Sequence, residues 1–266
     1  MPALPVVVGL ALLTGAAVAL VTLLADRLGG KVGGLLATAP VTTSAALLFL
    51  SSTDPVSVHV RLMAAGGPLL ASTVGIVGFF FAVKFTRGRP DPVRVAVGLL
   101  TYAAVFIGLA LLFSQTLPAE PWVFGVLFIF HALLALTLMR VPIRVLEGYK
   151  PKARKLTWGE IGLRFAAGAA FFLALTGLAT YAPALAPAFA VFPAVFMVSL
   201  GVMGLTQNAP FAARASQSGI FGTTAVALFV LSFDVLIIFG RAFSLLGAWV
   251  VYFFSLYGLG KVREHL

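Results

Sequence analysis

The sequence of 266 residues contains no cysteine, only eight acidic residues and three histidines that lie far apart. Without cysteine there is no disulfide framework, no thiolate nucleophile and no thiolate metal site. The separation of His59, His131 and His265 argues against a site built from several histidines, so we predict no metal and no cofactor. Charged residues make up only 10% of the chain, hydrophobic residues 61%, and the mean hydropathy is +1.09. These values lie outside the soluble range and make the bilayer the expected solvent.

The sequence also lacks the patterns that carry hydrolytic chemistry inside a membrane. It has no HExxH motif, no paired aspartates and no GxSxG motif, and an enzyme acting on lipid needs a pair of catalytic polar groups at one depth. We therefore expect no enzyme. The formal charge of +10 does not indicate a nucleic-acid partner, because the basic residues sit in short gaps between apolar runs, where positive-inside sorting explains them.

Nine apolar runs of spanning length can be drawn, and a helix is the expected form of each, because a membrane span must satisfy its own backbone groups. The predicted fold is an all-α polytopic membrane protein with nine transmembrane helices. The runs are Leu4–Ala25, Val32–Leu50, Gly67–Phe85, Val93–Phe113, Trp122–Met139, Ile161–Tyr181, Pro187–Leu205, Gly219–Phe239 and Phe243–Leu259.

The distribution of lysine and arginine predicts the orientation. When the gaps are assigned alternately to two sides, one side collects all of these residues except Arg61 and Arg241. This places the chain in the cytoplasmic (inner) membrane with its N-terminus outside and its C-terminus in the cytoplasm. The N-terminal MPALPVVV lacks a basic region, so the first run is expected to be a retained span. The basic gap 141–159 is expected to contact anionic lipid headgroups, with a regulatory or partner-docking role as the alternative.

The chain resembles itself at an offset of 153 residues. At this offset Gly15 meets Gly168, Pro40 meets Pro193, and Arg61 meets Arg214. The span Trp122–Met139 separates the two copies and would turn the second upside down. We predict two inverted four-helix repeats, residues 1–116 and 158–266, joined by a linking helix and basic loop at residues 117–157.

Prolines in the middle of two spans predict broken helices. Pro40 lies among Thr38, Thr42, Thr43 and Ser44, and its repeat mate Pro193 follows Phe192. A proline removes one helical N–H and favours the first position of a new helix. Two such helix N-termini would approach the membrane centre from opposite sides and form a pocket for an anion or a polar solute. The alternative is two simple kinks, with hydroxyls satisfying the freed carbonyls.

Four ionisable residues complete the predicted site. Arg61 and Arg214 each precede a span and are candidates to attract and read an anion, or simply to snorkel to headgroups. His131, in the linking helix, is a candidate for gating or proton coupling, with a buried structural histidine as the alternative. Asp234 is a candidate coupling site or the partner of Arg241.

The segment from each mid-span proline to the next arginine resembles the GlpM family of small bacterial membrane proteins. The matching residues are ATAP with Arg61 in the first copy and AVFP with Arg214 in the second. This chain departs from that family in being a fused pair with an extra linking helix. The resemblance implies four-span units of opposite orientation and supplies no catalytic residue.

These patterns favour a membrane transporter that moves a small anionic or polar solute by alternating access, through a site between the two broken helices. A passive channel or lipid scramblase on the same scaffold is the alternative, and a structural membrane subunit is a third. The expected partners are the lipid bilayer and the solute. Homo-oligomerisation is left open.

Overall fold

The computed structural model describes residues 4–50, 65–116, 120–139, 157–181 and 194–264, and these form helices and no strand. A short 3-10 helix, η3 (Ile237–Phe239), joins the last two α-helices. The α-helices are α1 (Leu4–Ala37), α2 (Val41–Leu50), α4 (Gly66–Phe85), α5 (Asp91–Thr116), α6 (Pro121–Met139), α7 (Trp158–Tyr181), α9 (Ala194–Thr206), α10 (Ala209–Leu236) and α11 (Arg241–Glu264).

The length and composition of the helices fit a membrane protein. Five stretches of the described residues are long and apolar enough to cross a bilayer. Large apolar side chains such as Leu100, Ile129 and Phe254 are more than 60% exposed on the outer helices, which suits a surface in contact with lipid. The nine-span count remains a prediction. The five stretches are Leu4–Ala25, Gly66–Phe85, Asp91–Phe113, Trp158–Gly177 and Ala209–Phe239.

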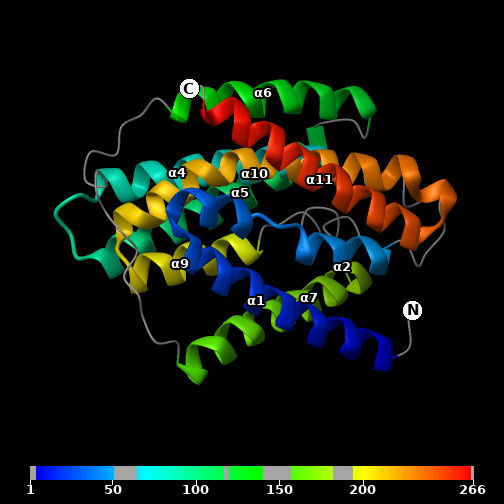
Figure 1. The fold of residues 1–266 in the computed structure, drawn as a ribbon, viewed down its shortest axis with the longest axis horizontal. Helices are drawn as coiled ribbons and strands as arrows, with labels where there is room; N and C mark the ends of the chain where they lie inside the picture. The colour runs from blue at the N-terminus through cyan, green and yellow to red at the C-terminus, as the bar shows by residue number, and fades with distance from the viewer. Residues whose placement is uncertain (1–3, 51–64, 117–119, 140–156, 182–193, 265–266) are drawn as a thin grey trace.

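Two predicted gaps between spans are helical in the structure, which corrects the sequence analysis. The gap after Ala25 lies within α1, which continues to Ala37 and changes direction before its end (Figure 1). Glycines at 29, 30, 33 and 34 provide a reason, because glycine pairs allow a helix to bend sharply. The gap before Gly219 lies largely within α10, which begins at Ala209 because Asn208 caps it and Pro210 occupies its first turn.

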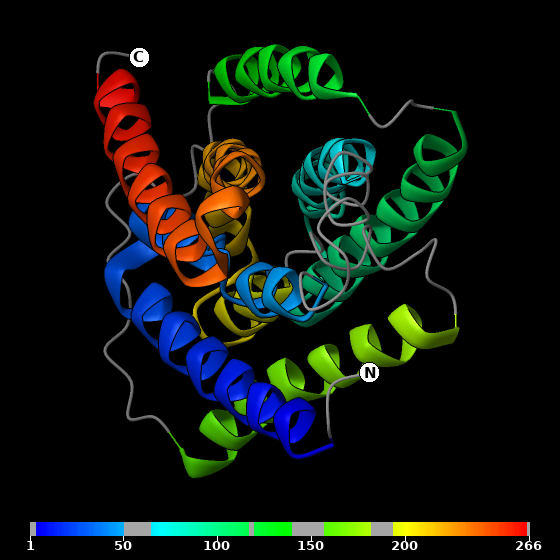
Figure 2. The same cartoon turned by 90° about the vertical axis from the view of Figure 1, so that its right-hand side faces the viewer.

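Helices α4 and α10 form the centre of the molecule, and the other long helices surround them. About 67% of the apolar window of each is buried, against 28% for α5 and 22% for α7. They pack on one another and run in opposite directions (Figure 1). α5 packs on α4, α11 packs on α10, and α6 lies across both central helices (Figure 2).

The two helical hairpins turn at opposite ends of the molecule (Figure 1). The turn between α4 and α5 contains Gly88 at φ 95°, and the turn between α10 and α11 contains Gly240 at φ 103°. Only glycine adopts this backbone conformation without strain, which explains its presence in both turns. The first turn and its flanks carry Lys84, Arg87, Arg89 and Arg94, whereas Arg241 is the basic residue beside the second.

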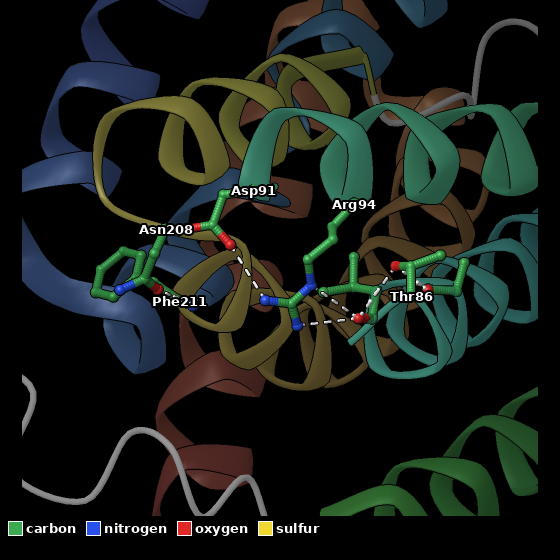
Figure 3. Close-up of polar contacts among 7 residues, drawn as sticks. Thr86, Asp91, Arg94, Asn208 and Phe211 are labelled. Carbon is green, nitrogen blue, oxygen red and sulfur yellow. Dashed lines mark hydrogen bonds and ion pairs between the residues drawn. The ribbon is translucent and has the colours of Figure 1, made fainter. Parts of the chain in front are cut away.

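Polar contacts fix the ends of these hairpins (Figure 3). The guanidinium of Arg94 donates from Nε and Nη2 to the carbonyl oxygen of Val83, at 3.3 and 3.0 Å, and from Nη1 to Asp91 at 3.1 Å. This satisfies a carbonyl at the C-terminal end of α4, where cations are favoured. At the start of α10, the side chain of Asn208 accepts a hydrogen bond from the amide of Phe211 at 2.7 Å.

Helices α1 and α7 cross at a close contact between glycines, and in Figure 1 they form an X. A Cβ added at Gly168 would lie 3.1 Å from the Cα of Gly15, and one added at Gly15 would lie 2.6 Å from the carbonyl oxygen of Phe165. Small residues permit this approach. Gly15 and Gly168 are also separated by 153 residues, so two positions related by the predicted repeat offset meet at this crossing.

Candidate functional site

The helix break predicted at Pro40 is present. α1 ends at Ala37 and α2 begins at Val41. The amides of Thr38 and Ala39 close the last turn of α1 onto Leu35 and Leu36. Proline has no N–H, the amide of Val41 bonds to Ala39 O at 2.7 Å, and that of Ser44 bonds to Pro40 O at 2.7 Å. The start of α2 therefore presents the amides of Thr42 and Thr43 and a positive dipole end.

This break borders a small buried cavity between the two halves of the chain. Its wall is formed by the break and α2 together with α4, α9 and α10. About 10 Å³ is open to the centre of a water molecule, which is room for about one water. The lining residues are Ala37, Thr38, Ala39, Thr42, Thr43, Leu69, Ser72, Val195, Thr223 and Val226.

Two positions related by the predicted repeat offset both line this cavity. Thr42 and Val195 both line it and are separated by the same 153 residues as the two contacting glycines. The wall is nevertheless chemically unequal. Most of its hydroxyls come from the first half of the chain, whereas α9 contributes Val195. The first half of the chain therefore supplies most of the polar groups at the cavity.

Two hydroxyls at the cavity lack a hydrogen-bond partner within the described parts of the chain, those of Thr42 and Thr43, each only 3% exposed. The other three are bonded. Thr38 donates to Leu35 O at 2.6 Å, Ser72 pairs with the hydroxyl of Tyr102 at 3.1 Å, and Thr223 donates to Ile220 O at 2.8 Å. Hydroxyls that face a cavity favour an occupant with which they can hydrogen-bond, so the Thr42 and Thr43 side chains favour a polar occupant.

A chain of hydrogen bonds leads from the cavity wall to the linking helix. Thr223 Oγ1 lies 3.2 Å from Thr73 Oγ1, which lies 2.8 Å from Nε2 of His131. His131 is fully buried, and its Nδ1 has no hydrogen-bond partner among the described residues. The chain thus joins α6, α4 and α10, one element from the linker and one from each half.

The predicted site residues divide into three groups. The structure brings Thr38, Thr42 and Thr43 to the cavity, with Pro40 in the break beside them. It connects His131 to the cavity through two hydroxyls. Arg61, Phe192 and Pro193 lie outside the described residues, although α9 begins directly after residue 193.

The structure does not bring Arg214 or Asp234 into the cavity wall. Arg214 lies in the second turn of α10 and donates to Gln217 at 2.8 Å. It is nine residues from Thr223, and Asp234 is eleven, which corresponds to about 13 and 16 Å along a helix. In the described part of the chain, no acidic or basic residue belongs to the cavity lining.

Sequence reasoning missed Ser72, Thr73, Tyr102 and Thr223. Ser72 and Thr73 form a hydroxyl pair within α4, and Thr223 belongs to a similar pair within α10. Two adjacent hydroxyls in a long apolar run are a usable signal, because hydroxyls buried in a membrane helix can hydrogen-bond to a neighbouring helix. Which of them meet one another depends on packing between helices, which no single run encodes.

Comparison with known proteins gives one family match. Residues 10–117 match the model of a family described as "Protein of unknown function (DUF3147)". The match covers less than half of the chain and ends one residue after the predicted boundary of the first repeat. It does not connect the chain with the GlpM family, so that resemblance remains an expectation. No curated protein and no solved structure matches the chain.

Proposed function

We propose that this chain is an integral membrane transporter that moves a small anionic or polar solute by alternating access between two inverted repeats. One observation carries the proposal: a helix broken at Pro40 borders a cavity that both halves of the chain line, and two threonine hydroxyls there have no hydrogen-bond partner among the described residues. Broken helices at the interface of inverted repeats are where secondary transporters bind their substrates.

The arrangement of the helices supports an inverted repeat. Equivalent glycines meet where α1 crosses α7, and α4 runs antiparallel to its counterpart α10. The α4–α5 and α10–α11 hairpins turn at opposite ends, and the basic residues concentrate at the first turn. Under the positive-inside rule, the first turn belongs in the cytoplasm and the second outside. The family match to residues 10–117 is consistent with the first repeat being a unit of its own.

The chemistry of the cavity supports a small solute that accepts hydrogen bonds. The start of α2 provides helix amides, and Thr42, Thr43, Ser72 and Thr223 provide hydroxyls. Helix N-termini favour anions through their unpaired amides and their dipole. The cavity has room for about one water, so a larger solute requires the broken helix and α10 to move apart. Gly222 lies directly against the Thr38 side chain at this contact and keeps the two elements close.

The test is solute flux in proteoliposomes that contain the purified protein, with chloride, nitrate, phosphate, urea and glycerol as probes. Thr42→Val together with Thr43→Val removes both unpaired hydroxyls and keeps the side-chain shape. We expect flux of the transported probe to fall about tenfold or more, because two hydrogen bonds of about 1 kcal/mol each are lost. Thr137→Val, which removes an exposed hydroxyl on α6, is the matched control and should leave flux unchanged.

A second pair of variants addresses the break itself. Pro40→Ala with Pro193→Ala is expected to abolish flux while the folded protein remains in the membrane. Unchanged flux in this variant or in the threonine double variant rejects the site. Counterflow separates a carrier from a passive pore: a carrier shows stimulation by solute on the opposite side, and a channel or scramblase does not.

A further inference from the structure

Among the described residues, the cavity at the helix break offers an anion no counter-charge in its wall. These residues contribute helix amides, hydroxyls and apolar side chains, and no lysine or arginine. An isolated charge at mid-membrane depth is costly, and buried charges are normally neutralised by a partner. A carrier for anions therefore needs a compensating positive charge within reach of this cavity.

His131 is the group that can supply this charge. It is fully buried and connects through Thr73 and Thr223 to the cavity wall. Its unpartnered Nδ1 leaves one ring position open for a second proton. Two hydrogen bonds of 2.8 and 3.2 Å separate the imidazole from the cavity-lining hydroxyl, so an imidazolium and an anion would lie within about 10 Å, where attraction in low dielectric is strong.

Within the described parts of α4 and α10, the two helices that pack on α6, no charged residue lies close to the hydrogen-bonded threonines. On α4 the ionisable residue is Lys84, eleven residues from Thr73, or about 16 Å along the helix. On α10 the ionisable residues are Arg214 and Asp234, nine and eleven residues from Thr223. Tyr102 on α5 is a titratable residue beside the cavity, and its hydroxyl bonds to Ser72. Tyrosine is neutral at ordinary pH, so it supplies hydrogen bonds and no charge.

The hydroxyls of Thr73 and Thr223 provide a physical coupling between the proton on His131 and the anion in the cavity. Without an anion, Thr223 donates to Ile220 O and Thr73 donates to Leu69 O. An anion in the cavity attracts the Thr223 proton, and Thr223 then accepts a hydrogen bond from Thr73. Thr73 in turn accepts from Nε2–H of His131. Every donor now points toward the anion, which favours the imidazolium. No covalent bond changes: one proton binds at Nδ1, and each hydroxyl keeps its own proton.

We propose that His131 is the proton-binding site of an electroneutral symporter that carries one small monovalent anion together with one proton, coupled through Thr73 and Thr223. This rests on the transport function proposed above and adds the coupling ion and the charge of the solute. His131 and Thr73 act on the solute through Thr223 and are positioning residues. Uptake is therefore expected to increase as the pH falls, because the protonated imidazole is the form that permits anion entry.

The first experiment measures proton binding and does not depend on transport. In protein labelled with ¹⁵N-histidine and embedded in nanodiscs, chloride or nitrate is added at constant pH. The His131 signal, assigned with His131→Gln, is expected to move toward the imidazolium form. Thr73→Val breaks the hydrogen-bond chain but retains the histidine, and it should abolish this response. If neither anion moves the signal, the proposal is wrong.

The second experiment measures coupling in proteoliposomes that contain a pH-sensitive dye. With nitrate or chloride outside, the wild-type protein should acidify the interior in a 1:1 ratio with anion uptake, at a rate independent of an imposed membrane potential. His131→Gln keeps a hydrogen-bonding side chain. In this variant, acid-stimulated uptake should fall at least tenfold, and the uptake that remains should not depend on pH. His59→Gln and His265→Gln are the controls for loss of a histidine elsewhere.

The outcomes separate the two proposals. If an anion promotes protonation of His131 but no uptake is measured, the transport function is refuted and the coupled binding of anion and proton stands. Anion uptake that does not respond to pH, or that is equally pH-dependent in the His131→Gln protein, refutes the coupling and leaves transport.

Discussion

The contact between Gly15 and Gly168 allows the meeting of the two halves to be tested with a matched set of glycines. Gly15 and Gly168 are packed tightly where α1 crosses α7. Gly9 and Gly162 lie six residues earlier on the same two helices and are also related by 153 residues, but a Cβ at either would have nothing within 4 Å. Alanine at all four positions gives the same chemical change in two packing environments.

The expected magnitudes follow from this geometry. Replacing a helical glycine by alanine stabilises the helix by about 0.5–1 kcal/mol, and this contribution applies to all four sites. At Gly168 the new methyl group would lie 2.8 Å from Cβ and Cγ2 of Val18, well inside the 3.5–4.0 Å of normal carbon contacts. Overpacking of this kind costs about 1–3 kcal/mol. The free energy of unfolding of Gly168→Ala should therefore be about 1–3 kcal/mol below that of Gly162→Ala.

The measurement is equilibrium unfolding in mixed micelles of increasing SDS content, followed by tryptophan fluorescence. Gly15→Ala should behave like Gly168→Ala, and Gly9→Ala like Gly162→Ala. The double variant at positions 15 and 168 should lose less than the sum of the single losses, because the first methyl group already separates the helices. Equal stabilities for Gly168→Ala and Gly162→Ala would show that α1 and α7 do not cross at these residues.

Two further predictions concern the ends of the hairpins. Because the chain has no cysteine, Arg89→Cys and Arg241→Cys each introduce a single thiol, both at exposed positions. We expect an impermeant maleimide to label position 241 in intact cells and position 89 only after lysis. Labelling of both positions from one side would contradict the inverted arrangement. Asn208→Ala removes the side chain that accepts a hydrogen bond from the Phe211 amide and should lower the free energy of unfolding by about 1 kcal/mol in the same SDS titration. Asn208→Asp keeps an acceptor and should retain most of the wild-type stability. An Asn208→Ala protein as stable as wild type would mean that this cap does not support α10.

Several features of the fold could be predicted from individual runs of residues. The apolar runs indicated helices, and Pro40 indicated a break that the structure places between Ala37 and Val41. The boundaries were less accurate where a turn was inferred from charge alone. Basic residues after Ala25 indicated a gap, but α1 remains helical there, because a lysine or arginine does not interrupt backbone hydrogen bonds.

Only the part of the candidate site that the segment around Pro40 contributes could be predicted from the sequence. Thr38, Thr42 and Thr43 were identified because they surround a proline, and all three line the cavity. Ser72 and Thr223 were missed because nothing near them in the chain distinguishes them from hydroxyls that bond back to their own helix. Arg214 was expected at the site, yet it lies about two and a half turns of α10 away from Thr223.

The sequence by itself determined that the chain is helical and suited to lipid, and that one of its helices breaks at Pro40. These properties depend on composition and on the backbone chemistry of proline, which act within a few residues. Only the tertiary structure decided that the break faces Ser72 and Thr223, and that His131 reaches it through Thr73. The hydrogen bonds of Thr73 to His131 and Thr223 join residues 58 and 150 positions apart, and they are fixed by how closely the helices pack.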